Sequence, residues 1–290
     1  MCRLFGFRSV IPSQVHRSLV AADNALAKQS EAHPDGWGVA YYVDGAPHVT
    51  KSAAGAMDDV LFRRVSGIVS SETVMAHIRR ATQGALTVLN SHPFQHGRWV
   101  MAHNGDIPGF ERCRERLEHV IAPRLRRFIL GETDSERSFF VFLTELAKCG
   151  DLGGRFGLDE VVTALRETVA QVRALCDGPA GPDGPDGEVA PSRALLTLMV
   201  TNGQVMAAHH GGKDLFYSTW KRRCADRDVC PSLSSVCEAA STTGFVNHLL
   251  IASEPLQGEN VWVPLAEGDV VGVDWRMRLA LSTATVAPAA

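Results

Sequence analysis

Apolar and polar residues recur with two different periods along the chain, and the mixture changes near residue 193. Over residues 14–29 the apolar positions return every three or four residues, which predicts a helix. Residues 37–53 contain two strand-like runs around an Asp-Gly pair, a pattern typical of a β-hairpin. Further along, the pattern predicts helices over 58–69, 133–148 and 158–176 and strands over 73–80 and 98–105.

The remainder of the chain is rich in strand patterns. Short apolar runs predict successive strands at 193–200, 203–210, 214–220, 247–253 and 269–275. Mixed helices and strands followed by a strand-rich part indicate an α+β protein rather than a repeat of βαβ units. Residues 177–192 are rich in Pro, Gly and Asp and predict a flexible surface excursion. We expect a single domain over residues 2–290 that contains this excursion.

Composition narrows the class of protein further. The 290-residue chain is 45% hydrophobic and 21% charged, which is ordinary for a globular protein. Its formal net charge of -3 argues against a nucleic-acid partner held by a general basic field. We expect no membrane span and no signal peptide, because no apolar run is long enough. The seven cysteines are irregularly spaced and predict no disulfide framework, so we expect a reducing cytoplasm.

Cys2 directly follows the initiator methionine, which makes it a candidate nucleophile. A thiol with an ordinary pKa near 8.5 is mostly protonated at neutral pH, so a base must take its proton. Once Met1 is removed, the α-amino group of Cys2 itself has a suitable pKa, near 8. Taken alone, Cys2 fits a small buried hydrophobe near a terminus better.

Residues 103–105 lie at the end of a predicted strand and offer donors for an oxyanion. The Asn104 side-chain amide and the Gly105 backbone N–H can both donate, and glycine lets a substrate approach the main chain closely. A simple Asn-Gly turn is the alternative interpretation. We expect His103 to support this corner rather than to act as a base. The residues that follow, 106–110, predict a helix start.

Arg79 and Asp134 are candidates for binding the two charges of an amino acid. The planar guanidinium of Arg79 can hold a carboxylate with two hydrogen bonds, and an ordinary salt bridge is the alternative. Asp134 lies between Thr133 and Glu136, which have the spacing of a capping box, so it should begin a helix. An acid fixed there can also pair with an α-ammonium group. Thr82 adds a hydroxyl to the same pocket.

Two other segments are weaker candidates. In residues 33–38 the glycines allow a tight turn, and Trp37 is expected to form a wall of the substrate site. In residues 221–244 three cysteines occur without any CxxC pair, so we expect no zinc site. This second segment is expected to border the substrate entrance, because loops after strands often carry specificity.

Together and in this order, the motifs resemble a class II glutamine amidotransferase domain, one of the N-terminal-nucleophile hydrolases. More narrowly, the chain is similar to the small stand-alone branch that includes the amidohydrolase of ergothioneine biosynthesis. The resemblance extends from Cys2 to the strand near Val270. It implies a four-layer α/β/β/α sandwich of two antiparallel sheets. Arg80 stands where the family often carries an aromatic residue, which makes the local substrate contact an open point.

The resemblance also implies roles for individual residues. Cys2 would be the nucleophile, Arg79 the carboxylate-binding residue, Asn104 and Gly105 the oxyanion donors, and Asp134 the amine-binding acid. The expected substrate is a small molecule, glutamine or a γ-glutamyl compound, whose γ-amide is cleaved through a γ-glutamyl thioester. Neither a metal nor an organic cofactor is expected.

Two alternatives stay open. The chain could be a glutaminase subunit that delivers ammonia to a separate synthase, or a catalytically silent binding or scaffold relative. The intact set of site residues argues against the silent relative. The sequence leaves open the leaving group and the oligomeric state, a homodimer included.

Overall fold

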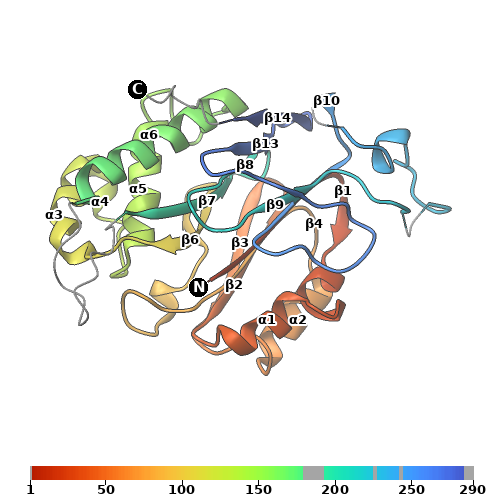
Figure 1. The fold of residues 1–290 in the computed structure, drawn as a ribbon, viewed down its shortest axis with the longest axis horizontal. Coiled ribbons are helices and arrows are strands. Elements are labelled where there is room, and N and C mark those ends of the chain that lie inside the picture. Colours follow the sequence, from red (N-terminus) through yellow and green to blue (C-terminus); the bar gives the residue numbers. More distant parts are fainter. Residues whose placement is uncertain (1, 179–192, 225–226, 242–243, 284–290) are drawn as a thin grey trace.

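The computed structural model describes residues 2–178, 193–224, 227–241 and 244–283 (Figure 1). In this part of the chain the strands form two antiparallel sheets. Sheet A has the order β12 (Val263–Pro264), β9 (Phe216–Ser218), β11 (His248–Ala252), β1 (Arg3–Gln14), β4 (Ser70–Ile78), β2 (Trp37–Val43), β3 (Ala46–Ser52). Sheet B has the order β10 (Gly244–Phe245), β14 (Arg278–Ser282), β13 (Val270–Val273), β8 (Met206–His209), β7 (Leu195–Thr201), β6 (Trp99–Asp106), β5 (Phe94–His96).

Helices cover the outer face of each sheet (Figure 1). Sheet A is covered by α1 (Leu26–Gln29) and α2 (Val60–Ile68). Sheet B is covered by α3 (Phe110–Val120), α4 (Pro123–Arg126), α5 (Asp134–Leu146) and α6 (Leu158–Cys176). One hydrophobic core lies between each sheet and its helices, and a third lies between the two sheets. The predicted four-layer α/β/β/α sandwich is therefore confirmed.

Strand β1 shows how the sequence pattern builds these layers. Leu4 belongs to the core between the sheets, whereas Phe5 and Phe7 belong to the core under α1 and α2. Successive side chains of a strand point to opposite faces, so one apolar run fills two cores. Gly6 lies on the inter-sheet side, where an added Cβ would collide with the side chain of Met199. The two sheets can approach closely here only because this position has no side chain.

Most elements lie where the pattern predicts them. Strands β2 and β3 form the predicted hairpin, and both turn residues, Asp44 and Gly45, have positive φ. Helices α2, α5 and α6 are confirmed, as are strands β4, β6, β7, β8, β9, β11 and β13. Most of the predicted excursion, 179–192, lies outside the described residues.

Two helical predictions need correction. The single helix expected over 14–29 is divided into a short π-helical turn and α1, because the backbone of Ala22 is extended. Between the two pieces, the Asn24 side chain donates to the Pro255 carbonyl and accepts from the Gln257 backbone, so this point is anchored to a distant loop. Helix α3 was missed beyond its start, although its buried residues Phe110, Cys113 and Leu117 follow a helical period.

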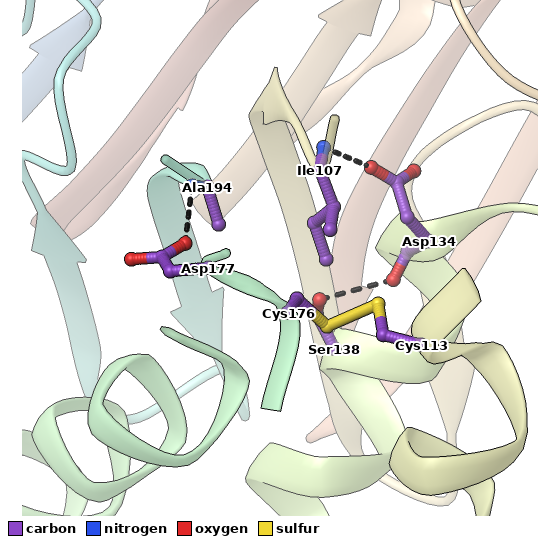
Figure 2. Close-up of a disulfide and its surroundings, with 7 residues drawn as sticks. All are labelled: Ile107, Cys113, Asp134, Ser138, Cys176, Asp177 and Ala194. Carbon is purple, nitrogen blue, oxygen red and sulfur yellow. Dashed lines mark hydrogen bonds between the residues drawn. A yellow bond between two sulfur atoms is a disulfide. The ribbon is translucent and has the colours of Figure 1, made fainter. Parts of the chain in front are cut away.

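A disulfide joins two of the helices over sheet B. Cys113 of α3 pairs with Cys176, the last residue of α6 (Figure 2). The cysteine spacing predicted no disulfide framework and could not reveal this pair, because the packing of α3 against α6 brings the two residues together. Among the helices in the described ranges, none is both long and apolar enough to span a membrane.

Candidate active site

Cys2 lies directly before β1, where the pairing with β4 places it next to the end of that strand. Arg3 pairs with Ile78, so the thiol meets the backbone that follows β4. The Cys2 Sγ atom accepts a hydrogen bond from the Arg80 backbone N–H and donates one to the Arg80 carbonyl, each at 3.4 Å. Burial raises the pKa of the Cys2 thiol, although the Arg80 backbone bond and the charge of Arg79 act in the opposite direction. The thiol is thus protonated at neutral pH and needs a base.

A narrow cavity opens beside Cys2 and collects most of the predicted site residues. Four segments that are distant in sequence contribute to it: the N-terminus, the segment after β4, the end of β6 and the start of α5. Its lining includes Cys2, Arg79, Thr82, His103, Gly105 and Asp134 from the prediction, and Arg80, Gln83, Asn90, His92, Thr133 and Ser135 in addition.

Arg79 is buried and holds the loop that follows it. Its guanidinium donates to the backbone carbonyls of Gln83 and Ala85, at 2.9 and 3.1 Å. The same side chain lies within the electrostatic reach of Cys2 and Asp134, whose negative charges would favour its protonated form. Arg79 therefore shapes the 81–90 loop and also lines the cavity.

Asp134 is the first residue of α5 and is buried. One carboxylate oxygen accepts from the Ile107 backbone N–H at 2.9 Å (Figure 2), and the other accepts from the Ser135 backbone N–H at 2.8 Å. Burial raises the pKa of Asp134, while these backbone donors favour the charged form. The carboxylate is fixed in place from two sides.

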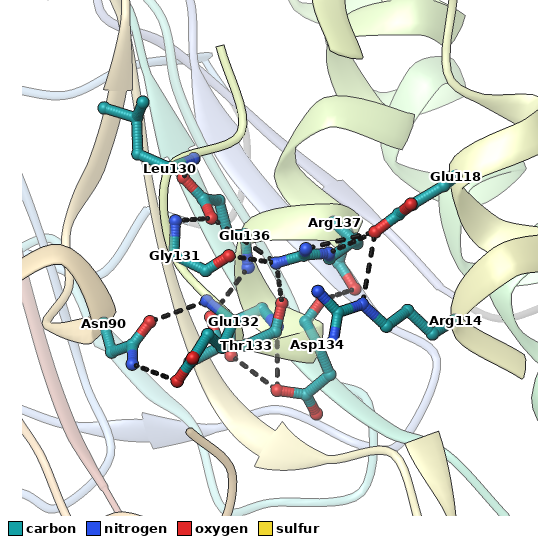
Figure 3. Close-up of polar contacts among 12 residues, drawn as sticks. Asn90, Arg114, Glu118, Leu130, Gly131, Glu132, Thr133, Asp134, Glu136 and Arg137 are labelled. Atoms are coloured by element: carbon teal, nitrogen blue, oxygen red, sulfur yellow. Dashed lines mark hydrogen bonds and ion pairs between the residues drawn. The ribbon is translucent and has the colours of Figure 1, made fainter. Parts of the chain in front are cut away.

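The start of α5 is held by the predicted cap and by an additional network (Figure 3). Thr133 Oγ1 accepts from the Glu136 backbone N–H at 3.2 Å, as the spacing predicts. The Glu136 carboxylate does not complete a capping box. It accepts instead from the backbone N–H groups of Leu130 and Gly131, at 3.0 and 2.7 Å. Asn90 joins the network by accepting from the Glu132 N–H, which ties the 81–90 loop to the start of α5.

Asn104 is buried behind the cavity and is not among its lining residues. Its Nδ2 donates to Ser253 Oγ at 3.3 Å, and the same hydroxyl accepts from the Leu4 backbone N–H at 3.0 Å. The Asn104 Oδ1 atom has no hydrogen-bond partner in the described structure. Ser253 thus connects the predicted oxyanion donor to β1. The sequence contains no local signal for this contact.

Gly105 and His103 are fixed by the pairing of β6 with β7. A Cβ at position 105 would overlap the Leu195 carbonyl and the His103 ring, so only glycine fits. His103 contacts Ser135 Oγ and the Leu195 carbonyl through its two ring nitrogens, both at 2.8 Å. A histidine with both nitrogens engaged in this way suits a supporting residue better than a base.

Two further residues of the site were not predicted. Asp35 accepts from the Ala81 backbone N–H at 2.8 Å and so connects the 33–38 loop to the cavity. His92 lines the cavity, and neither of its ring nitrogens has a partner among the described residues. Its ring lies 4.1 Å from that of His77, and burial lowers the pKa of His92 well below the ordinary value. His92 is thus a neutral side chain next to the candidate nucleophile.

Two sequence predictions about the surroundings of the site need correction. Trp37 is fully buried, donates to Asp59 Oδ2 at 2.9 Å and packs against Phe62, so it faces α2 and does not line the cavity. The segment 221–241 does not border the site either. Lys221 and the three cysteines of this segment line a different cavity, which lies against the second half of β1. Within the described ranges, no three His, Cys, Asp or Glu side chains are grouped as metal ligands would be.

The sandwich architecture and the position of Cys2 define the class of protein. Two antiparallel sheets enclosed by helices, with a cysteine beside the first strand, are the arrangement of the N-terminal-nucleophile hydrolases. Residues 1–178 match the family of glutamine amidotransferases, class-II. The chain belongs to this family.

Individual relatives agree with this assignment. The chain is 29% identical over 227 residues to the probable glutamine amidotransferase DUG3 of Saccharomyces cerevisiae. The matched region covers 71% of the chain and 62% of DUG3. The chain is 33% identical over 119 residues to the gamma-glutamyl-hercynylcysteine sulfoxide hydrolase of Mycobacterium tuberculosis, covering 37% of the chain and 50% of that protein. A class-II domain protein from Silicibacter pomeroyi has the same fold, with a TM-score of 0.63, 21% identity and complete coverage of both chains.

Proposed function

We propose that the enzyme cleaves the γ-amide of a γ-glutamyl conjugate or of glutamine, with the Cys2 thiolate as the nucleophile. The observation that carries this proposal is the convergence of Cys2, Arg79 and Asp134 on one cavity, from three segments that are distant in sequence. A glutamyl group has a carboxylate and an ammonium on one carbon and an amide at the far end. Arg79 and Asp134 offer the opposite charges for the first two, and Cys2 offers a thiol for the amide.

The α-amino group of Cys2, free after removal of Met1, supplies the base. Because burial favours the protonated thiol, an adjacent amine must remove that proton before attack. The sulfur then attacks the γ-carbonyl carbon, and the leaving amine takes a proton as the C–N bond breaks. Water hydrolyses the resulting γ-glutamyl thioester, releases glutamate and restores the thiol. The proposed donors to the oxyanion in both steps are the backbone N–H of Gly105, which lines the cavity, and the second N–H of the Asn104 amide, whose first N–H is held by Ser253.

The glutamyl end is bound by opposite charges. Arg79 pairs with the α-carboxylate, and Asp134 pairs with the α-ammonium. The two backbone bonds accepted by Asp134 leave further lone pairs on its oxygens for a substrate amine. Because the start of α5 fixes this carboxylate, substrate binding does not have to order it.

Arg80 favours a conjugate over free glutamine as the substrate. Its backbone contacts the Cys2 sulfur, its side chain is exposed at the cavity, and within the described residues that guanidinium has neither a hydrogen bond nor an ion pair. A free guanidinium beside the nucleophile would attract a leaving group that carries a carboxylate. Ammonia, the leaving group from glutamine, could not use this charge.

The test compares glutamate release from glutamine, γ-glutamylglycine and γ-glutamylglycinamide. Cys2→Ser should abolish release from all three, whereas Cys149→Ser, at an exposed free cysteine, should retain it. Arg80→Gln should lower kcat/KM for γ-glutamylglycine about tenfold, as loss of one charge-assisted contact does, and leave the amide unchanged. Full activity in Cys2→Ser would refute the mechanism. Turnover of glutamine alone would favour the glutaminase subunit, and no turnover would favour the silent relative.

A further inference from the structure

A second cavity lies over sheet B, away from the candidate active site. It has a volume of about 370 Å³ and opens between the turn that joins β5 to β6, helix α4 with the residues after it, and the loop that joins α5 to α6. It shares no lining residue with the active-site cavity. The lining consists of His96, Gly97, Arg98, Arg124, Leu125, Arg127, Phe128, Asp151, Leu152 and Gly153.

The cavity has an excess of positive charge. Three arginines line it, and in the described part of the chain none of their guanidiniums pairs with an acid. Arg98 is half-buried, and its guanidinium lies beside the β2–β3 turn, where its Nη2 atom is 3.4 Å from the position that a Cβ of Gly45 would take. The one acidic lining residue, Asp151, accepts from the Gly153 backbone N–H within its own turn. Arg124 and Arg127 against Asp151 leave a net charge of +1 around this space.

Other arginines near this cavity differ from the lining arginines, because their guanidiniums have hydrogen-bond or ion-pair partners. Arg126 lies between two of the lining arginines in sequence, yet it donates to the carbonyls of Ile121 and His119 and so closes the end of α3. Arg137 pairs with Glu118. The cavity arginines have no such structural task, and like charges facing one space repel one another unless an anion lies between them.

An aromatic surface adjoins the charges. Phe128 is 41% exposed, the Arg127 guanidinium lies 4.9 Å from its ring centroid, and the His96 ring lies 4.7 Å from it. Burial lowers the pKa of His96, so this ring is uncharged at neutral pH. An exposed phenyl ring beside guanidiniums offers apolar contact to the organic part of an anionic ligand.

We propose that this cavity binds a small phosphate ester. The guanidiniums of Arg124 and Arg127 would hold the phosphate, because their planar forks match its oxygens and their two charges match a dianion. The organic part would lie against Phe128. The volume is within the range typical of small-molecule sites.

The test is isothermal titration calorimetry of the full chain with four probes: AMP, ribose 5-phosphate, inorganic phosphate and adenosine. Both esters should bind saturably and more tightly than inorganic phosphate, and adenosine should bind weakly. Arg124→Gln/Arg127→Gln should weaken ester binding about tenfold or more, as expected for lost charge-assisted bonds. Both side chains are exposed, so this double variant should fold.

Matched controls define the result that would overturn the proposal. Arg116→Gln, at an exposed position of α3 outside the cavity, should leave ester binding unchanged. Phe128→Ala should weaken AMP more than ribose 5-phosphate. The absence of saturable ester binding at millimolar concentration, or equal affinities in the double variant and Arg116→Gln, would overturn the assignment. Equal affinity for inorganic phosphate and both esters would refute an ester as the ligand. The readout is binding alone, so it does not depend on the proposed hydrolysis.

Discussion

At the residue scale, Cys2 is the proposed nucleophile, and its surroundings favour the protonated thiol. Its sulfur is buried and contacts the backbone of Arg80, and burial outweighs the charge of Arg79 in setting the direction of the pKa shift. In the described structure no histidine or carboxylate side chain is hydrogen-bonded to the Cys2 sulfur. The remaining candidate for the base that takes the thiol proton is therefore the α-amine of Cys2 itself, which is free once Met1 has been removed.

This requirement gives the first prediction. An active preparation should begin at Cys2, because only then is the α-amine free to take the thiol proton. Intact mass spectrometry should show the loss of one methionine. A variant with an uncleavable residue inserted before Cys2 should fold but release almost no glutamate. An active sample that retains Met1 quantitatively would contradict the mechanism.

Asn104 and Arg79 should differ in which kinetic constant they change. Asn104→Ala removes a proposed donor to charge that develops only in the transition state, so kcat should fall by about 10²–10³ with little change in KM. Arg79→Lys keeps the charge but loses the two-pronged geometry, so it should mainly raise KM. Asp134→Asn should also raise KM.

Steady-state kinetics with the best substrate provide the measurement for these variants. Ser253 sharpens the comparison, because its hydroxyl holds the Asn104 amide without lining the cavity. Ser253→Ala should therefore lower kcat less than Asn104→Ala does, with KM unchanged. The roles are wrongly assigned if Asn104→Ala changes KM alone while Arg79→Lys leaves KM unaltered.

At the scale of elements, the start of α5 joins stability to substrate binding. The Thr133 cap fixes the first turn, whose first residue is Asp134, and Glu136 fixes the loop before it. The same loop is tied through Asn90 to the segment that Arg79 holds. The two charges that would bind a glutamyl group thus rest on one connected network, of which Figure 3 shows the part from Asn90 to the start of α5.

Removal of the cap should therefore affect both properties. Thr133→Ala should lower the free energy of unfolding by about 1 kcal/mol, the usual cost of a lost N-cap, and should raise KM because Asp134 becomes less well fixed. Urea denaturation and steady-state kinetics measure the two effects. The matched control is Thr163→Ala at an exposed position in α6, which should change neither. A stability loss without any change in KM would separate the cap from substrate binding.

At the scale of the whole molecule, buried neutral histidines make the fold sensitive to acid. Burial lowers the pKa of His77 to about 3 and the pKa values of His209 and His248 to about 4. In the unfolded chain these groups titrate near their ordinary pKa of about 6.5, so below that pH the unfolded state binds more protons. The stability is present above about pH 6.5 and is lost as the pH falls towards 4.

Urea denaturation at several pH values tests this expectation. The free energy of unfolding should fall steadily from about pH 7 to about pH 5. His248→Gln should make this dependence shallower, whereas His119→Gln, at an exposed position of α3, should leave it unchanged. Equal stability across this range would show that the buried histidines are protonated in the folded state.

The sequence by itself determined the local elements and most of the chemistry. The Asp44–Gly45 turn, the Thr133 cap and the strand periods depend on neighbouring residues, so their physical causes are present in the order of amino acids. The residue types that line the cavity were also predictable, because amide cleavage demands a nucleophile, oxyanion donors and counter-charges.

Only the tertiary structure decided which residues meet across the sandwich. Ser253 reaches Asn104, and Cys113 reaches Cys176, because strand pairing and helix packing join segments far apart in the chain. The placement of Trp37 was also decided there, since strand β2 has two apolar faces and the period does not say which one faces the site. Contacts of this kind depend on the packing of complete layers, and no local pattern of residues contains that information.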